Sequence, residues 1–145
     1  MHVAEALRAE GLVVNEIRGW QTRGRPGIFR PIGMVWHHTA GTKSLGIIIN
    51  GRRDLPGPLA NLHVEKPGHV NLVSQLRCNH AGRGANEVLG RIRRGLAPRG
   101  DAGALGLADT ADGNGVFWGV EVENLGDGRD PYPAAQLETC ARIGA

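Results

Sequence analysis

The sequence has few cysteines, no long apolar stretch and no recognisable export signal. Only Cys78 and Cys140 are cysteines among its 145 residues, and their separation matches no metal or disulfide spacing. We therefore expect two reduced, buried thiols. No window approaches the run of roughly 18 apolar residues that a membrane-spanning helix needs. Residues 1–5 lack both the basic region and the apolar stretch of a secretory signal. We expect a protein made in the cytoplasm, with no membrane partner.

Aromatic residues and excess charge are also scarce. Aromatic residues make up 4% of the chain, and the formal net charge is +3 with a pI of about 9.4. This mildly basic balance suits nucleic acid, an acidic membrane or the bacterial wall, and does not choose among them. The arginines of residues 91–99 have no aromatic residues between them, so base stacking has little support and no nucleic-acid partner is expected.

What the chain does contain is the composition of one globular domain rich in loops. It is 41% hydrophobic and includes 23 glycines. Apolar periodicity predicts helices over 3–9 and 43–50, strands over 32–39, 61–65, 70–74 and 116–123, and a final helix that begins after Pro133 and is still running at Ala145. Residues 66–69 predict an antiparallel hairpin turn.

Interleaved strands and helices indicate an α/β fold: a single domain over residues 1–145, with a central mixed β-sheet flanked by helices. The polar, Gly-rich residues 82–115 predict a long surface excursion without regular structure. A domain seldom ends within an amphipathic helix, so we also expect that the C-terminal end of this domain is missing.

Two neighbouring histidines end the strand over 32–39, an apolar run that predicts a buried strand. His37 and His38 must point to opposite faces, because side chains alternate along a strand. Histidine at a strand end is a common zinc ligand, but a buried histidine bonded to a carbonyl is the more frequent case.

Two acids share one face of the strand over 116–123. Glu121 and Glu123 alternate with Val120 and Val122, and burying two carboxylates on one face is unfavourable unless they are paired or used. The two glutamates indicate either an edge strand with one solvent-exposed face or a general base beside a metal. His80, at the end of the second hairpin strand, indicates little alone.

Four segments resemble, in order, motifs of the type 2 N-acetylmuramoyl-L-alanine amidases, a family related to phage lysozyme-type amidases and animal peptidoglycan recognition proteins. Residues 35–41 (Val-Trp-His-His-Thr-Ala-Gly) are similar to the strand that carries the family's first zinc ligand, which corresponds to His37. The other three segments are residues 60–64 followed by Pro67-Gly68, the His-Ala-Gly at 80–82, and residues 118–124, which resemble the family's Gly-Ile-Glu strand. The resemblance runs from about residue 32 to the end of the chain.

The chain departs from the family pattern in three places. A catalytic Tyr followed by His is replaced by Ala60 and Asn61, which leaves Glu121 as the acid–base candidate. The Trp that precedes His-Ala-Gly is Asn79. No histidine follows His80, so the family's remaining zinc ligands are expected beyond residue 145.

The resemblance implies a monomeric zinc hydrolase that acts on peptidoglycan or muropeptides. It would cut the amide between N-acetylmuramic acid and L-alanine, in phage lysis as an endolysin or in recycling of wall fragments. His37 is then a zinc ligand, Glu121 is the catalytic acid–base, and His38, Asn61 and His80 bind substrate. With one identified ligand, the chain as given is expected to bind zinc weakly or not at all and to be inactive.

Two alternatives remain open. A non-catalytic peptidoglycan-binding module would keep the groove without the metal, although the presence of His37 argues against it. A basic nucleic-acid-binding domain using residues 91–99 is more distant, and it predicts affinity that falls steeply with salt.

Overall fold

A five-stranded sheet forms the centre of the protein in a computed structural model that describes residues 2–98, 100 and 103–145. Its strands are β1 (Val14–Glu16), β6 (Val70–Leu72), β5 (Leu62–Val64), β9 (Trp118–Val122) and β2 (Met34–His38), in that spatial order. β5 and β6 are antiparallel, and all other neighbouring pairs in this sheet are parallel. The predicted α/β domain with a mixed sheet is therefore confirmed.

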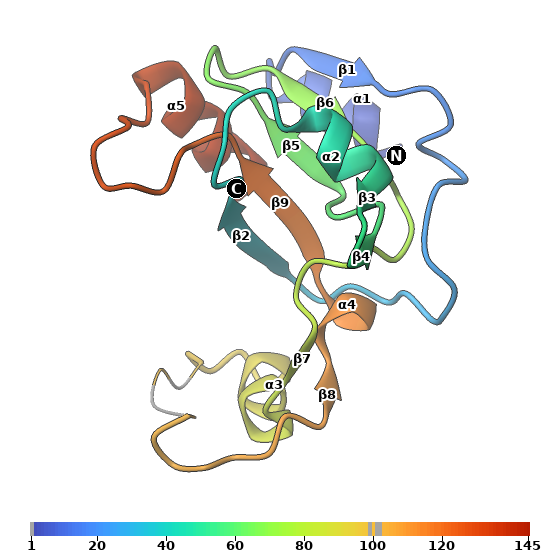
Figure 1. Ribbon diagram of the computed structural model, residues 1–145, viewed down its shortest axis with the longest axis vertical. Coiled ribbons are helices and arrows are strands. Elements are labelled where there is room, and N and C mark those ends of the chain that lie inside the picture. The colour runs from blue at the N-terminus through green and yellow to red at the C-terminus, as the bar shows by residue number, and fades with distance from the viewer. Residues whose placement is uncertain (1, 99, 101–102) are drawn as a thin grey trace.

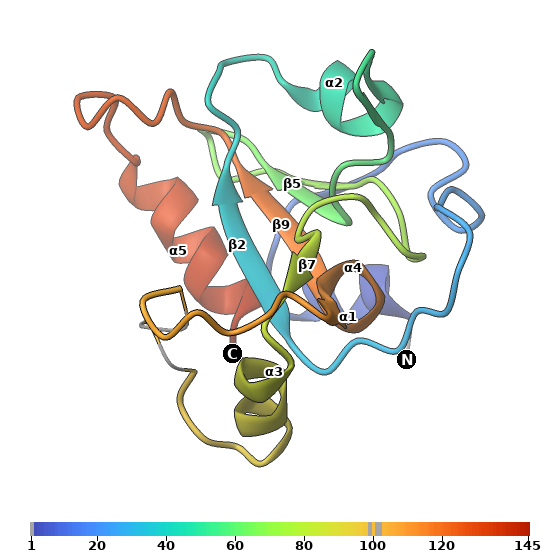
Figure 2. The same cartoon turned by 60° about the horizontal axis from the view of Figure 1, so that its bottom comes forward.

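One face of the sheet packs against α1 (Val3–Ala9) and α5 (Ala134–Ile143). Because side chains alternate along each strand, the even-numbered residues of β5, β6 and β9 all face this side. They form a buried core with the helix residues: Ala4, Leu7, Leu62, Val64, Val70, Leu72, Val120 and Val122. Figure 2 shows α1 and α5 on one side of the sheet and α2 (Leu45–Asn50) on the other.

The opposite face is only partly covered. α2 brings Ile48 against Ala60 and Val73 in a small second cluster, and it leads into the short hairpin of β3 (Gly51–Arg52) and β4 (Leu55–Pro56). Gly51 ends α2 with a φ of 77°, a backbone conformation that glycine adopts without strain. The polar side chains discussed below lie on this second face.

The predicted unstructured excursion contains regular structure, which corrects the sequence-based expectation. It leaves the sheet through β7 (Arg83–Gly84), forms α3 (Asn86–Arg93), and returns through β8 (Ala111–Asp112) into α4 (Gly113–Val116). Figure 1 shows these elements projecting from one end of the molecule. The amphipathic spacing of Val88, Leu89 and Ile92 supports a helix, but the surrounding glycines and arginines obscured it.

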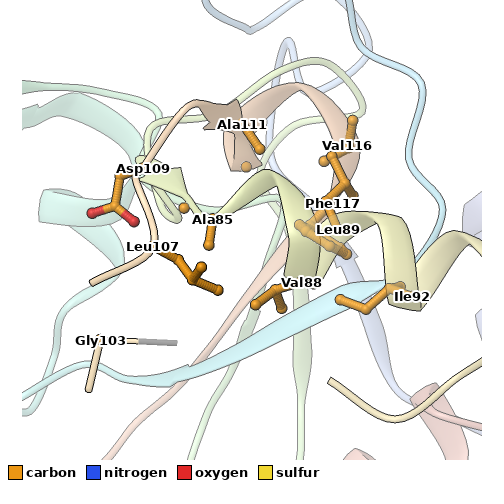
Figure 3. A pocket seen from close by; sticks show the side chains of 12 residues that line it. Ala85, Val88, Leu89, Ile92, Gly103, Leu107, Asp109, Ala111, Val116 and Phe117 are labelled. Carbon is orange, nitrogen blue, oxygen red and sulfur yellow. The ribbon is translucent and has the colours of Figure 1, made fainter. Parts of the chain in front are cut away.

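The excursion has an apolar pocket of its own, of about 300 Å³ (Figure 3). Val88, Leu89 and Ile92 of α3 line it together with Leu107 and Phe117, and among the described residues Asp109 is the one charged side chain in its lining. None of the site residues predicted from the sequence lines this pocket.

Two further predictions need correction. β2 was predicted to be buried, but it has a neighbour on one side only, so Met34 and Trp36 remain 37% and 41% exposed. The final helix ends at Ile143 with Gly144 as its C-cap, and so does not run to the last residue.

Neither thiol forms a disulfide; Cys78 is buried and Cys140 is half-buried. Over the part of the chain that the structure describes, no helix is long and apolar enough to cross a membrane.

Candidate active site

A row of polar side chains crosses the second face of the sheet, one from each strand. In register from one edge to the other, the row is His37 on β2, Glu121 on β9, His63 on β5, Asn71 on β6 and Asn15 on β1. Register partners on neighbouring strands point to the same face, so the five side chains lie side by side. The sheet therefore brings His37 and Glu121 together, as the predicted site requires.

Glu121 lies in the middle of the sheet with an unsatisfied carboxylate. Its Oε2 is buried and has no hydrogen-bond partner among the described residues. Burial raises the pKa of Glu121 from 4.5 to about 7, because the charged form loses solvation without gaining a partner. The carboxyl can therefore gain or lose a proton near neutral pH, as a general acid–base must.

His37 faces His80, which comes from the loop after β6. The distance from His37 Nε2 to His80 Nδ1 is 3.4 Å, and the two rings meet edge to face at 76°. Burial lowers the pKa of both histidines, that of His80 to about 4. The nearby charge of His38 lowers the pKa of His37 further, so both imidazoles are neutral at pH 7.

Several contacts hold His80 in this place. Its Nε2 lies 2.9 Å from the carbonyl oxygen of Phe117. A carbonyl can only accept, so Nε2 carries the hydrogen and Nδ1 has a free lone pair toward His37. The ring also lies directly on Gly119, where a Cβ would be 2.5 Å from His80 Cγ. Only glycine at 119 leaves room for the imidazole.

Asn114 holds the loop itself. Its Oδ1 accepts hydrogen bonds from the backbone N–H groups of His80, Ala81 and Gly82, at 2.9, 2.8 and 3.1 Å. Asn114 is buried in the short helix α4. One side chain therefore ties the His-Ala-Gly segment to the strand that carries Glu121.

His63, which the sequence analysis left without a role, occupies the place between Glu121 and Asn71. The Asn71 Nδ2 group donates to Glu65 Oε1 at 2.9 Å and to His63 Nδ1 at 3.2 Å. Since His63 Nδ1 accepts, its Nε2 carries the hydrogen. Nε2 is buried without a hydrogen bond among the described residues, 3.7 Å from Glu123 Oε2. Burial lowers the pKa of His63, and the charges of Glu123 and Glu65 oppose that shift.

The alternation of Asn61, His63 and Glu65 along one strand was the available signal for this network. This alternation alone does not predict the network, because only the pairing of β5 with both β6 and β9 brings Asn71 and Glu121 to either side of His63.

Asn61 has a structural place that differs from the predicted substrate contact. It is fully buried, and its Nδ2 donates to the carbonyl oxygens of Ser74 and Leu76. Its Oδ1 accepts from the backbone N–H of Gly119 at 2.9 Å. With no exposed surface and its hydrogen bonds used inside the protein, Asn61 joins β9 to the 74–76 segment and is not available to a ligand.

His38 lies apart from the other predicted site residues. It is the register partner of Val122, whose side chain is in the core, so it belongs to the opposite face from His37. Its ring lies against Gly126, and its Nδ1 accepts from the backbone N–H of Ala40 at 3.2 Å. The structure thus groups His37, His80 and Glu121 and leaves His38 outside the group.

A polar hollow of about 370 Å³ adjoins the row at His63 and is lined by Lys43, Leu45, His63, Glu65, Lys66, Pro67 and Glu123. Lys66 is engaged with Asp130, with Nζ 2.7 Å from Oδ1. The hollow thus presents the His63 imidazole, two carboxylates and two lysine side chains.

A zinc ion, which the resemblance implies, finds part of a site in these residues. Within residues 2–98, 100 and 103–145, no three His, Cys, Asp or Glu side chains are grouped closely enough to hold a metal. Two neutral imidazole nitrogens, His37 Nε2 and His80 Nδ1, do face each other, and this donor type fits zinc. The described residues therefore supply fewer than the three protein ligands that a catalytic zinc site needs.

Comparison with known proteins identifies the family. The family model described as N-acetylmuramoyl-L-alanine amidase matches residues 29–145, which include the whole row except Asn15. Comparison with curated proteins and with solved structures found no match. The chain therefore belongs to the N-acetylmuramoyl-L-alanine amidase family, whose members act on the peptidoglycan of the cell wall.

Proposed function

We propose that this chain is a zinc-dependent hydrolase of the amide bond between the lactyl group of N-acetylmuramic acid and the L-alanine of the stem peptide. The observation that carries the proposal is Glu121, a half-buried residue with a pKa of about 7 beside His37 on the neighbouring strand; its Oε2 is buried without a hydrogen-bond partner among the described residues. An unpaired buried acid is unfavourable for folding, so its presence beside a potential zinc ligand is typical of a catalytic site.

In this proposal, His37 of the row binds the metal and Glu121 transfers protons. His37 would hold zinc through Nε2. When bound, zinc lowers the pKa of a water molecule toward roughly 7 and polarises the amide carbonyl. Glu121 would accept the proton of the attacking water at its carboxylate and donate it to the nitrogen of the leaving L-alanine.

His63 would keep the surroundings of Glu121 polar on one side. Its Nε2–H is the unsatisfied donor nearest in register to Glu121, and Asn71 and Glu65 hold its tautomer. A carbonyl oxygen of the stem peptide in the adjoining hollow would satisfy this donor.

Cleavage of a defined muropeptide tests the proposal. The chain, supplied with excess zinc, is incubated with a soluble disaccharide-tetrapeptide, and the products are identified by mass spectrometry. The single ligand identified in the sequence led to an expectation of inactivity, whereas the proposal predicts free disaccharide and an intact peptide that begins with L-alanine. His37→Ala and Glu121→Gln should both abolish these products. Cleavage at any other bond, or activity in either variant equal to that of the original chain, would contradict the proposal.

The same chemistry serves either lysis or recycling, and the substrate distinguishes the two. An endolysin-like role predicts that the chain also releases stem peptides from intact sacculi. A recycling role predicts cleavage of soluble muropeptides alone. Parallel assays on both substrates separate these roles.

A second candidate, a non-catalytic muropeptide-binding module, is favoured by one observation: no three metal-binding side chains are grouped among the described residues. It predicts that muropeptides bind without being cut at saturating zinc. Calorimetry alongside the cleavage assay distinguishes binding from turnover.

A further inference from the structure

A groove of about 540 Å³ lies at the base of the excursion. It is lined by the segment before β2, by α3 and by the segment from β8 to α4. Figure 1 shows that the excursion joins the sheet at the end where β2 and β9 begin. We call this the basal groove; Arg30 and Arg93, from two different elements, are its basic lining residues in the described part of the chain.

Neither guanidinium of the basal groove has a partner among the described residues. Arg30 is held by its main chain, because its backbone N–H donates to the carbonyl oxygen of Gly115 at 2.9 Å. The described acid of the groove, Asp112, is already engaged, since its two carboxylate oxygens accept from Arg77 Nη2 at 3.1 and 3.0 Å. The groove therefore presents two unpaired positive charges and an occupied carboxylate.

These charges favour an anionic occupant with phosphate groups. A guanidinium is a planar fork of N–H donors that matches the oxygens of phosphate in a bidentate arrangement. Ile28, Ile32 and Val116 form apolar walls, which suit the carbon atoms between the phosphates. No described lining residue is aromatic, so nucleic-acid bases have no side chain on which to stack. The groove is therefore suited to a polymer of sugars or polyols joined by phosphodiesters.

The basal groove is distant from the candidate active site. Glu121 is five residues beyond Val116, and His37 is five residues beyond Ile32. Extended chain covers roughly 16 Å over that length. β2 and β9 are parallel, so both separations run in the same direction. An occupant of the groove is therefore not the amide that would be cleaved at Glu121.

We propose that the basal groove binds a phosphodiester polymer of the bacterial wall, with Arg30 and Arg93 donating hydrogen bonds to its phosphate oxygens. The family to which the chain belongs acts on peptidoglycan. An anionic polymer in the same wall would hold the chain beside its substrate and leave the row on the sheet open. This inference goes beyond the proposed function and requires neither zinc nor cleavage.

The competing explanation is attraction between the polymer and the net charge of the whole chain. Arg53 and Arg94 allow a matched comparison, because neither lines the groove in the part of the chain that the structure describes. Arg94 follows Arg93 directly and its Nε donates to the carbonyl oxygen of Gly90 at 3.2 Å, while Arg53 is exposed between β3 and β4. Replacing either pair of arginines with glutamine removes two positive charges and lowers the formal net charge from +3 to +1.

Fluorescence anisotropy with a labelled, lipid-free poly(glycerol phosphate) makes the test. The whole chain is titrated at several salt concentrations, and we expect the affinity to fall as salt screens the charges. Arg30→Gln with Arg93→Gln should raise the Kd about 5- to 20-fold, since each exposed charge pair contributes a factor of up to about five. Arg53→Gln with Arg94→Gln should change the Kd less than about twofold, because salt screens charges that do not touch the polymer. Thermal unfolding checks that both pairs of variants fold as the original chain does.

Two further ligands identify the occupant. A single-stranded oligonucleotide with the same number of phosphates should bind more weakly than the polymer, because the groove offers its bases no aromatic surface among the described residues. An excess of the disaccharide-tetrapeptide should not displace the polymer, because muropeptides would occupy the row on the sheet.

An equal loss of affinity in the two pairs of variants would show that only net charge matters, and would overturn the inference. An oligonucleotide that binds as tightly as the polymer and depends on Arg30 and Arg93 would identify a nucleic-acid site instead. Displacement by the muropeptide would make the groove part of the substrate site, and absence of polymer binding to the original chain would refute the inference outright. Each of these results leaves the proposed function intact, because the muropeptide assay measures cleavage separately.

Discussion

At the scale of single residues, the site depends on a difference between two glutamates on the same face of β9. Glu123 has a histidine nitrogen 3.7 Å away, whereas Glu121 Oε2 is buried without a hydrogen-bond partner among the described residues. Burial of an unpaired carboxyl raises its pKa, so Glu121 is the group suited to exchange protons near pH 7.

We expect Glu121→Gln to lower kcat for muropeptide cleavage about 100- to 10,000-fold, because a general acid–base contributes on that order. The amide keeps the shape of the side chain but cannot accept a proton. Substrate affinity, measured by calorimetry, should change little. Glu123→Gln is the matched control on the same strand face; an equal loss of kcat in both variants would refute the separate role of Glu121.

The same substitution should stabilise the metal-free protein in a pH-dependent way. The pKa of Glu121 is about 7 in the folded protein against 4.5 ordinarily. The folded state thus keeps a proton that the unfolded state releases, so the stability of the original chain falls as pH rises from 4.5 to 7. After allowance for solvent screening of this partly exposed group, the loss is about 1–2 kcal/mol, or roughly 3–6 °C in Tm.

Glutamine does not ionise and avoids this loss. The gain in Tm of Glu121→Gln should therefore be larger at pH 8 than at pH 5, measured by thermal unfolding in the presence of a chelator. Glu10→Gln, at an exposed position, is the control for the loss of a surface charge. A gain that is equal at both pH values would mean that Glu121 is already ionised and paired at pH 5.

At the scale of elements, the Asn114 side chain of α4 holds the His-Ala-Gly loop, and His80 of this loop contacts the strand β9. Asn114 accepts three backbone hydrogen bonds from the loop, and His80 packs on Gly119 of β9. The position of the His80 ring therefore depends on α4, the four-residue helix that precedes β9.

We expect Asn114→Ala to lower the free energy of unfolding by about 2–3 kcal/mol, since it leaves three backbone donors in a partly buried loop without an acceptor. Urea unfolding measures the change. Asn50→Ala is the control, because its exposed amide makes a single bond to the carbonyl oxygen of Gly46. Equal losses in the two variants would show that the loop is held by other contacts.

At the scale of the whole molecule, the excursion of residues 82–115 projects from the five-stranded sheet and packs little against it. α3 lines the pocket of the excursion together with Val116 and Phe117, and it makes no extensive contact with the strands of the five-stranded sheet in the described part of the chain. Among the described residues of the excursion, none belongs to the core around α1 and α5.

Replacement of residues 86–109 by a short Gly-Ser turn should therefore leave the sheet folded. We expect Tm to fall by no more than a few degrees, about 1 kcal/mol of stability in a chain of this size. Thermal unfolding followed by circular dichroism measures this, and the His37 and His80 signals in NMR spectra report on the site. Loss of cooperative unfolding would show that the excursion is part of the core.

The sequence by itself determined the fold class, the antiparallel hairpin, the family and the pairing of His37 with Glu121 as candidates for one site. These properties follow from local alternation, turn residues and the order of short motifs, all of which can be seen along the chain. It failed where a property depends on neighbours in space: the exposed edge of β2, the helix α3, and the burial of Asn61.

Only the tertiary structure decided which chemical groups meet. Strand order places Glu121 between His37 and His63, and the loop held by Asn114 brings His80 Nδ1 to His37 Nε2. Residues 43 positions apart cannot be paired from local pattern, because register and loop path are set by the packing of the whole sheet. The same packing removes water from Glu121, and that desolvation raises its pKa to about 7.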